Sequence, residues 1–341
     1  MLSKVSKDWL GAGFVTVLGL AILIFVPILF DLFEVLQMTK YVVLSLFVLS
    51  LAYIWGFGGI LSFGQAGFFG LGGYVFAVAA INMGQTTVPF LIAIGACALF
   101  AAALGYFMFY GRLNDVYLGV VTLVVTLILW KLINHTAGPE YIIGKARLGG
   151  FNGIPSIPIM TLPWRPGQEM EPAQMFQYFM AILIAVYVLL HALIKSKFGR
   201  VAISIRENEV RTGLLGYDVR FYKLCIFSIG GAIGGAAGAM WASYQTFVDP
   251  NIFSLEWSAK CLIWVMAGGV GTLFGPIVGV LALEYLSFQL GQTELINNLI
   301  VLGTILIFLV LLLPKGLFPT ARDLVVKVWR RRGGSTGKGS P

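Results

Sequence analysis

The stretch LSFGQAGFFGLGGY, residues 61–74, contains five glycines and one glutamine and lies between two long apolar runs. If the flanking runs cross a lipid bilayer, so much flexible backbone and a polar amide need an explanation. Glycine-rich interruptions are tolerated at membrane depth only where the freed backbone groups face protein or a water-filled cavity. The stretch therefore predicts a special place inside a membrane protein, provided that the rest of the chain is one.

The composition of the whole chain meets that condition. Of its 341 residues, 58% are hydrophobic and only 11% are charged, and the mean hydropathy is +0.89. Soluble domains carry about 25% charged residues, whereas several runs here reach the roughly 20 residues that cross a bilayer as a helix. The first run, 11–30, follows two lysines, but it exceeds a signal-peptide core and no small-x-small cleavage site follows it. We predict an all-α, polytopic helical membrane bundle that retains this first span.

Hydropathy predicts about ten transmembrane spans, some of them short and interrupted by glycine. They are expected near residues 9–30, 40–59, 66–82, 88–110, 116–134, 174–195, 220–243, 257–270, 273–290 and 295–313. This divides the chain into a membrane domain, residues 1–315, and a basic flexible cytoplasmic tail, residues 316–341.

Charge predicts the orientation. Segment 195–223 carries seven basic against three acidic residues, and the tail from Pro314 carries seven against one, while loop 135–173 balances three with three. Cytoplasmic loops are enriched in Lys and Arg, so both termini are expected in the cytoplasm and loop 135–173 outside. The net charge of +8 follows from this distribution and does not indicate a nucleic-acid partner.

The basic segment also predicts a short amphipathic helix at about 200–215. Val201 and Ile205 are four residues apart, as are Val210 and Leu214. Glu207 precedes Arg211 by four residues, which favours a helical ion pair, and Gly216 is a plausible helix stop. Such a helix either rests on lipid headgroups or docks in a groove on a cytoplasmic motor subunit. The pattern alone leaves both interpretations open.

A second glycine-rich zone, MAGGVGTLFGPIVG, occupies residues 266–279. Short, broken spans in both halves of a transporter indicate the substrate path, but small residues also let helices pack closely. For 220–243, where Gly230, Gly234 and Gly238 recur every fourth residue, we expect packing. For 61–74 we expect a broken helix, because the amide of Gln65 would otherwise remain unsatisfied in lipid.

Other polar groups offer few candidates for chemistry. Lys131 and Lys260 lie near span ends, where long side chains reach the interface. Glu284 lies deeper and is either a functional group, a partner in helix packing, or an interfacial residue if the span boundary differs. The three cysteines share no metal-ligand spacing, and the tail GGSTGKGSP lacks a P-loop. We therefore expect no catalytic residues, no metal and no cofactor, and any ATP dependence must come from a partner.

With these residues in view, LSFGQAGFFGLGGYVFA resembles the signature of the branched-chain amino acid permeases of ATP-binding-cassette transporters, the LivM-type subunit, a family that includes urea and amide importers. Four further blocks match in the same order: GRLNDVYLGVVTL (111–123), GGFNGI (149–154), FGRVAISIRENEVRTGLLGYDV (198–219) and MAGGVGTLFGPIVG (266–279). Together with the spans between them, the resemblance covers roughly residues 40–315.

The resemblance implies one of two membrane subunits of an importer in the bacterial cytoplasmic (inner) membrane. The implied partners are a second, homologous permease, two cytoplasmic ATP-binding subunits and a periplasmic substrate-binding protein. It makes 200–215 a coupling helix, with Arg206, Glu207, Asn208, Glu209 and Arg211 at the ATPase interface. The translocation path would include Gly64, Gln65, Gly67, Gly70 and, by its depth, Glu284.

Two questions stay open at this point. The outer loop 135–173 is longer than the resemblance leads us to expect, so the substrate remains a choice among branched-chain amino acids, urea and other small amides, and the loop is a candidate docking surface for the binding protein. A self-sufficient secondary transporter or channel is the alternative function, although only Glu284 fits its need for buried acidic groups. A membrane-embedded enzyme fits less well, because no paired catalytic groups lie at membrane depth.

Overall fold

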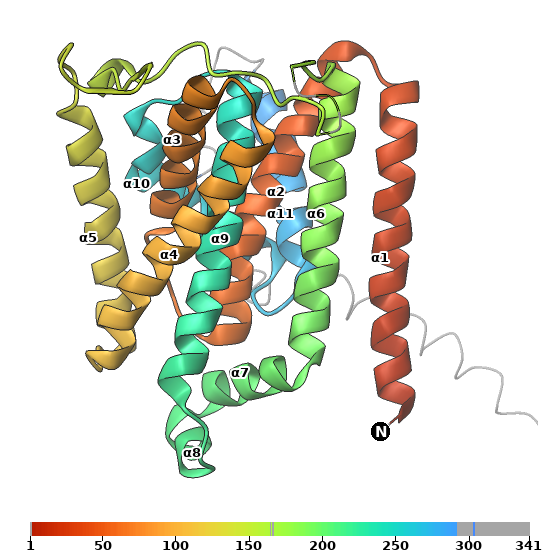
Figure 1. Cartoon of the computed structure of the whole chain (residues 1–341). Coiled ribbons are helices and arrows are strands. Elements are labelled where there is room, and N and C mark those ends of the chain that lie inside the picture. Colours follow the sequence, from red (N-terminus) through yellow and green to blue (C-terminus); the bar gives the residue numbers. More distant parts are fainter. Residues whose placement is uncertain (1, 164, 166, 292–302, 304–341) are drawn as a thin grey trace, which may run out of the picture.

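The computed structural model describes residues 2–163, 165, 167–291 and 303, and this part of the chain is a bundle of helices (Figure 1). In chain order the helices are α1 (Leu2–Leu29), α2 (Leu32–Gly58), α3 (Gln65–Met83), α4 (Thr87–Tyr110), α5 (Asp115–Asn134), α6 (Pro172–Lys195), α7 (Lys197–Glu207), α8 (Glu209–Leu214), α9 (Val219–Gln245), α10 (Leu255–Gly268) and α11 (Phe274–Gly291). Short 3-10 turns lie at Gly150–Asn152 and Pro250–Phe253, and the two-residue strands β1 (Ile142–Ile143) and β2 (Ala146–Arg147) form a hairpin.

Six of these helices, α2, α3, α4, α5, α6 and α9, are long and apolar enough to cross a membrane. The prediction of an all-α polytopic membrane bundle is therefore confirmed. Nine of the ten expected spans coincide with helices, but α10 has only 14 residues and reaches about 21 Å, short of the roughly 30 Å hydrocarbon core. The tenth expected span, 295–313, lies outside the described residues, so the span count stays a prediction.

The two ends of the bundle are different. Helices α7 and α8 lie at one end, which we call the α8 end, and α1 begins at that same end (Figure 1). The segment between α5 and α6 covers the opposite end, which we call the loop end. The basic segment and the long loop therefore lie on opposite sides, as the charge pattern predicts, while the assignment of a side to the cytoplasm stays a prediction.

Helices α2 and α9 form the centre of the bundle, and their most apolar windows are 89% and 72% buried. An aromatic cluster fills the space between α2, α3 and α10. The ring of Phe69 lies 4.3 Å from that of Phe47 and 5.5 Å from that of Trp257. Offset and tilted aromatic pairs at these distances add to the stabilisation from burial. Helix α5 lies at the outside of the bundle, and only 22% of its window is buried.

Helices α3 and α9 cross in close contact because glycines meet at the crossing. A Cβ atom added to Gly72 would overlap the backbone of Gly235, and one added to Gly238 would lie 2.7 Å from the carbonyl carbon of Phe69. The packing role predicted for the glycines of 220–243 is confirmed, and the glycines of α3 share it.

The expected break near 61–74 lies at the start of that stretch. Helix α2 ends at Gly58, and Gly59 adopts the left-handed conformation with φ +71°, which glycine reaches without steric cost. Residues 59–64 are not helical, and α3 then runs without interruption from Gln65. The broken-helix prediction is confirmed for 61–64 and is wrong for 65–74. The second glycine-rich zone breaks at residues 269–273, between α10 and α11.

The loop end is an ordered cap rather than an open loop. Ile154 pairs with Val248 across an isolated β-bridge, and Ile157 and Met160 are buried. The side chain of Asn82, at the end of α3, holds the hairpin by donating to the carbonyl of Ile143 over 2.8 Å. The length that the sequence singled out in 135–173 therefore serves partly to close this end of the bundle.

Candidate functional site

The amide of Gln65 lies at the first residue of α3, inside the bundle, with 0% of the residue exposed. Its Nε2 donates to the hydroxyl of Ser50 on α2 over 2.6 Å, and its Oε1 is buried without a hydrogen-bond partner among the described residues. A buried acceptor left unpaired costs about 1–3 kcal/mol. The hydroxyl of Tyr74 is the other buried side-chain atom of the 61–74 stretch without a partner among the described residues. The Gln65 oxygen is therefore free to receive a ligand or a moving backbone group.

The three glycines that the sequence places in the path with Gln65 are packed against other parts of the protein. Thr126 on α5 donates to the carbonyl of Gly64 over 3.2 Å, and a Cβ on Gly67 would lie 2.7 Å from the hydroxyl oxygen of the same threonine. A Cβ on Gly70 would press on the ring of Phe253. These three glycines thus permit close packing around Gln65.

The predicted coupling helix is two helices, because Asn208 ends one and begins the next. Its backbone is extended, with φ −161°, and its Oδ1 accepts from the amide of Arg211 over 2.8 Å as the N-cap of α8. The predicted ion pair between Glu207 and Arg211 is therefore wrong. Glu207 instead accepts from Arg206 over 2.6 Å, and the break takes it off the helix that carries Arg211. The predicted stop is confirmed, since α8 ends at Leu214 and Gly216 has φ +89°.

Arg206 connects α7 to both helix breaks. Its guanidinium donates to the carbonyl of Gly56 in the last turn of α2, where a cation is favoured by the helix dipole. A Cβ on Gly59 would lie 2.8 Å from the Arg206 side chain, and one on Gly271 would lie 3.7 Å from Nη1. The side chain thus contacts the end of α2 and lies close to the α10–α11 break.

Lys223 makes a second connection, which sequence reasoning missed. Its side chain is only 10% exposed, and its Nζ lies 2.5 Å from Glu209 of α8 and 3.7 Å from Asp115 at the start of α5. One cation on α9 thereby joins α8, α9 and α5. Fourteen residues separate Glu209 from Lys223, so no helical spacing in the sequence reveals the pair.

Replacing Lys223 with methionine should lower the thermal unfolding midpoint of the purified protein by about 2–6 °C, because Glu209 and Asp115 would lose the cation that both contact. Lys223→Arg should lie close to the wild type. Lys145→Met, on the exposed hairpin, is the matched control and should leave the midpoint unchanged. Equal midpoints for Lys223→Met and wild type, measured by size-exclusion chromatography after heating, would show that the ion pairs add no stability.

The expected amphipathic face divides between the two helices. Val201 and Ile205 of α7 are buried against the bundle. Val210 and Leu214 of α8 are 74% and 84% exposed, and the adjoining Leu215 is 68% exposed. A cluster of three apolar side chains, which we call the α8 knob, therefore projects at the α8 end with no covering element in the described part of the chain.

Glu284 lies in a different region from Gln65. Its carboxylate is 2.7 Å from Nζ of Lys40 on α2, and its side chain is 13% exposed. Ten residues of α2, about 15 Å of helix, separate Lys40 from Ser50, the partner of Gln65. The path residues predicted from the sequence therefore form two places and not one, and Lys40, which begins a predicted span, was not recognised as the partner of Glu284.

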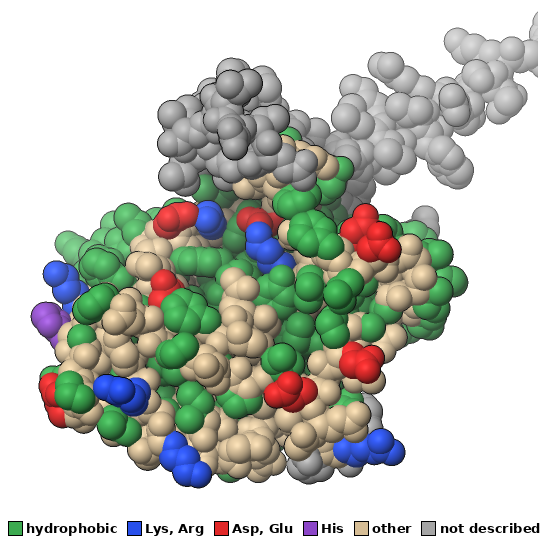
Figure 2. Space-filling model, turned by 90° about the horizontal axis from the view of Figure 1, so that it is seen from above, with side chains coloured by type: hydrophobic (Ala, Val, Ile, Leu, Met, Phe, Trp, Pro, Cys, Tyr) green, Lys and Arg blue, Asp and Glu red, His purple; other side chains and the backbone are tan. Residues whose placement is uncertain are grey.

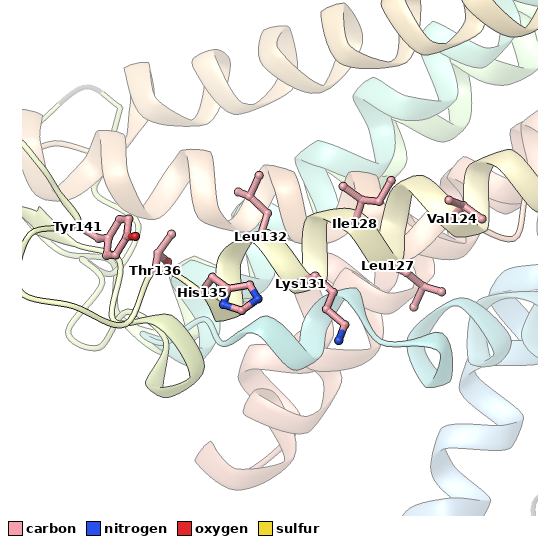
Figure 3. Close-up of a pocket in the computed structure, with 8 residues that line it drawn as sticks. All are labelled: Val124, Leu127, Ile128, Lys131, Leu132, His135, Thr136 and Tyr141. Atoms are coloured by element: carbon pink, nitrogen blue, oxygen red, sulfur yellow. The ribbon is translucent and has the colours of Figure 1, made fainter.

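A shallow groove of about 740 Å³ runs along the outer face of α5. Val124, Leu127 and Ile128 line one part of it, and Lys131, His135 and Tyr141 lie towards the other end (Figure 3). Apolar residues at membrane depth with a lysine, an imidazole and a tyrosine near the helix end are typical of a surface that faces lipid. The groove therefore provides no argument for a substrate site. The described residues also contain no group of three or more His, Cys, Asp or Glu that could hold a metal ion.

Comparison with known proteins identifies the family. The family described as "Branched-chain amino acid transport system / permease component" matches residues 35–311. The High-affinity branched-chain amino acid transport system permease protein LivM of Escherichia coli (strain K12) is 29% identical over 309 residues, covering 83% of this chain and 68% of the relative. The Probable branched-chain amino acid transport permease protein LivM of Methanocaldococcus jannaschii is 26% identical over 239 residues, covering 66% of each.

A shorter similarity reaches a permease with another named substrate. The Ribose import permease protein RbsC of Bacillus subtilis (strain 168) is 29% identical over 136 residues, covering 38% of this chain and 41% of the relative. No solved structure matches the chain. Because the family match spans most of the chain and most of its described helices, the chain belongs to the family of permease components of branched-chain amino acid transport systems.

Proposed function

We propose that the chain forms part of the translocation path of an ATP-driven importer for branched-chain amino acids in the bacterial cytoplasmic membrane. It hydrolyses no ATP itself. Two cytoplasmic ATP-binding subunits drive it, a second, homologous permease completes the membrane part as a heterodimer, and a periplasmic binding protein delivers the substrate at the loop end. Ten spans with both termini in the cytoplasm agree with this arrangement, since the α8 end is then cytoplasmic.

The observation that carries the proposal is the α8 knob together with its two connections to the bundle. Val210, Leu214 and Leu215 are apolar side chains exposed at the end that carries the basic segment 195–223, which suits a groove on a partner protein. A helix that only rested on lipid would need no ion pair to a buried lysine. The α8 knob therefore favours docking on a motor subunit over a headgroup contact.

The same connections suggest how ATPase movement reaches the path. Arg206 holds the end of α2 beside the non-helical segment 59–64, and Lys223 holds α8 to the start of α5. Thr122 and Thr126 of α5 in turn bond the backbone of residues 63 and 64. A shift of α7 and α8 would thus move both sides of the segment that leads into Gln65, and ATP and the binding protein would bias two states of this element.

The test is uptake by the assembled system. The chain is reconstituted in proteoliposomes with its ATP-binding subunits, its second permease and its binding protein, and radiolabelled L-leucine uptake is measured with and without ATP. We expect uptake that requires both ATP and the binding protein. Uptake of L-leucine by this chain alone, driven by an ion gradient, would instead establish a secondary transporter, and ATP-driven uptake of urea without L-leucine would overturn the substrate.

Gln65→Leu should lower ATP-driven uptake about tenfold while the protein still accumulates in the membrane, because leucine is close in size but removes the amide from the path. Losing one hydrogen bond that contributes about 1.4 kcal/mol of free energy corresponds to a tenfold change. Gln174→Leu, at the start of α6 on the loop end, is the control. Wild-type uptake from membrane-inserted Gln65→Leu would remove this residue from the path.

A further inference from the structure

A cavity of about 360 Å³ lies between α2, α9, α10 and α11, in the half of the bundle nearer the loop end. Its charged lining residues are Lys40, Lys260 and Glu284, and three tryptophans, Trp241, Trp257 and Trp264, line it as well. Figure 2 looks onto this end of the molecule and shows acidic and basic side chains close together among hydrophobic ones. Sites for small molecules have volumes of about 300–1,000 Å³, so this cavity suits a small ligand.

The charges around the cavity balance. Lys40 pairs with Glu284 at 2.7 Å, and Lys260 pairs with Glu256, one turn before it on α10, also at 2.7 Å. Of these four residues Glu284 is the most buried, and a buried ionisable residue in a membrane span is costly and marks a substrate or ion pathway. Glu256 is not part of the lining, but it neutralises Lys260 from outside. With it, two cations and two anions leave no net charge, so an ion of either sign gains nothing overall. A molecule that carries one positive and one negative group gains from both.

The walls suit an aliphatic side chain. The ring of Trp241 lies 5.1 Å from that of Trp257, nearly perpendicular to it, and Leu44 of α2 adds an aliphatic surface. Nζ of Lys260 lies 5.5 Å from the centre of the Trp257 ring, so this wall already contacts a cation. A lining that combines the Lys40–Glu284 pair with indole rings matches a molecule with a zwitterionic head and an apolar tail.

We infer that this cavity is a binding site for a neutral zwitterionic α-amino acid, carried by the permease itself. This rests on the proposed function and deepens it, because the permease then selects the substrate in addition to the binding protein. The ammonium group binds Glu284 and the carboxylate binds Lys40, so that the ligand replaces their direct ion pair, and the side chain packs on the tryptophans. Urea carries no charge and cannot compensate for opening that pair.

The position of the cavity suits an intermediate binding site that a substrate would occupy between the loop end and Gln65. Lys40, Leu44, Phe47 and Ser50 follow one another at helical spacing along α2. Lys40 and Leu44 line the cavity, Phe47 belongs to the aromatic cluster, and Ser50 bonds Gln65. The aromatic cluster therefore separates a charged cavity near the loop end from the buried amide deeper in the bundle.

Binding to the purified full-length chain in lipid nanodiscs tests the inference without the partner proteins. Tryptophan fluorescence is titrated to millimolar concentrations of L-leucine, L-leucinamide, 4-methylpentanoate and urea. L-Leucine carries both charges, L-leucinamide only the positive one, 4-methylpentanoate only the negative one, and urea neither. We expect a saturable change with L-leucine alone, and Trp257→Phe should alter its amplitude. Saturable binding of urea, or equal binding of the single-charge probes, would overturn the inference.

Variants separate a binding role from a structural ion pair. Lys40→Met and Glu284→Gln should each weaken L-leucine binding by at least about tenfold, while Lys145→Met should not. The exchange Lys40→Glu with Glu284→Lys restores an ion pair with reversed polarity. If the pair is only structural, the exchange behaves as wild type, which would overturn the inference. We expect it to restore thermal stability and not L-leucine binding.

A separate uptake assay distinguishes failure of the cavity site from failure of the proposed function. The same variants are assembled with the partner proteins and tested for ATP-driven uptake. ATP-driven uptake of L-leucine that is unaffected by Lys40→Met and Glu284→Gln would overturn the cavity site and leave the proposed function standing. Absence of any ATP-driven amino acid uptake by the wild type would overturn the proposed function, whatever the nanodisc titrations show.

Discussion

Gly238→Ala should destabilise the permease by about 2–4 kcal/mol, although alanine is the better helix former. In an exposed helix interior the change from glycine to alanine is favourable by about 1 kcal/mol. At Gly238, however, the new methyl group would lie 2.7 Å from the carbonyl carbon of Phe69 and 3.0 Å from the backbone nitrogen of Gly73. Backbone cannot move aside as a flexible side chain can, so α3 and α9 must separate, and overpacking of this kind costs up to about 3 kcal/mol or more.

Gly95→Ala on α4 is the matched control, because nothing lies within 4 Å of its added Cβ. The same substitution should there leave the stability unchanged or raise it slightly. Both variants are compared by thermal unfolding in detergent and by the amount of protein in the membrane. Equal midpoints for Gly238→Ala and Gly95→Ala would show that the crossing of α3 and α9 is not as close as described.

The glycines illustrate what the sequence could and could not predict. Their four-residue spacing in 220–243 indicates close helix packing, and the structure confirms it. In 61–74 the same residue type serves two purposes, a chain break before Gln65 and close packing after it. The sequence cannot separate these, because both need the absence of a side chain, and only the neighbouring helices decide which need applies.

The segment that forms α7 and α8 contains a local sequence signal for its break. Asn is among the best N-cap residues, and Asn208 does cap α8, so the break between α7 and α8 could have been predicted locally. The pairs Lys40–Glu284 and Lys223–Asp115 could not. Their members lie on different helices and far apart in the sequence, and only the fold brings them together. Composition predicted the membrane bundle, whereas the ion pairs between its helices depend on tertiary packing.

Replacing Val210 and Leu214 together with aspartate should abolish binding of the ATP-binding subunits and, with it, ATP-driven uptake. Both side chains are largely exposed and contribute no contact to the bundle core, so the permease itself should fold and insert normally. A few apolar anchors carry most of the energy of an interface, each with about 2–4 kcal/mol. Losing two of them corresponds to a loss of roughly a thousandfold or more in affinity, which co-purification of the ATP-binding subunits with the permease measures directly.

The control for this variant is Phe151→Asp, a substitution of another largely exposed apolar residue, 66% accessible, in the loop-end cap. It should leave co-purification unchanged, because it lies at the opposite end of the bundle. If the Val210→Asp/Leu214→Asp variant retains its ATP-binding subunits and transports as the wild type does, the α8 knob rests on lipid and the motor docks elsewhere. If the subunits are lost while Phe151→Asp keeps them, the exposed apolar side chains of α8 are the contact through which ATP hydrolysis acts on the bundle.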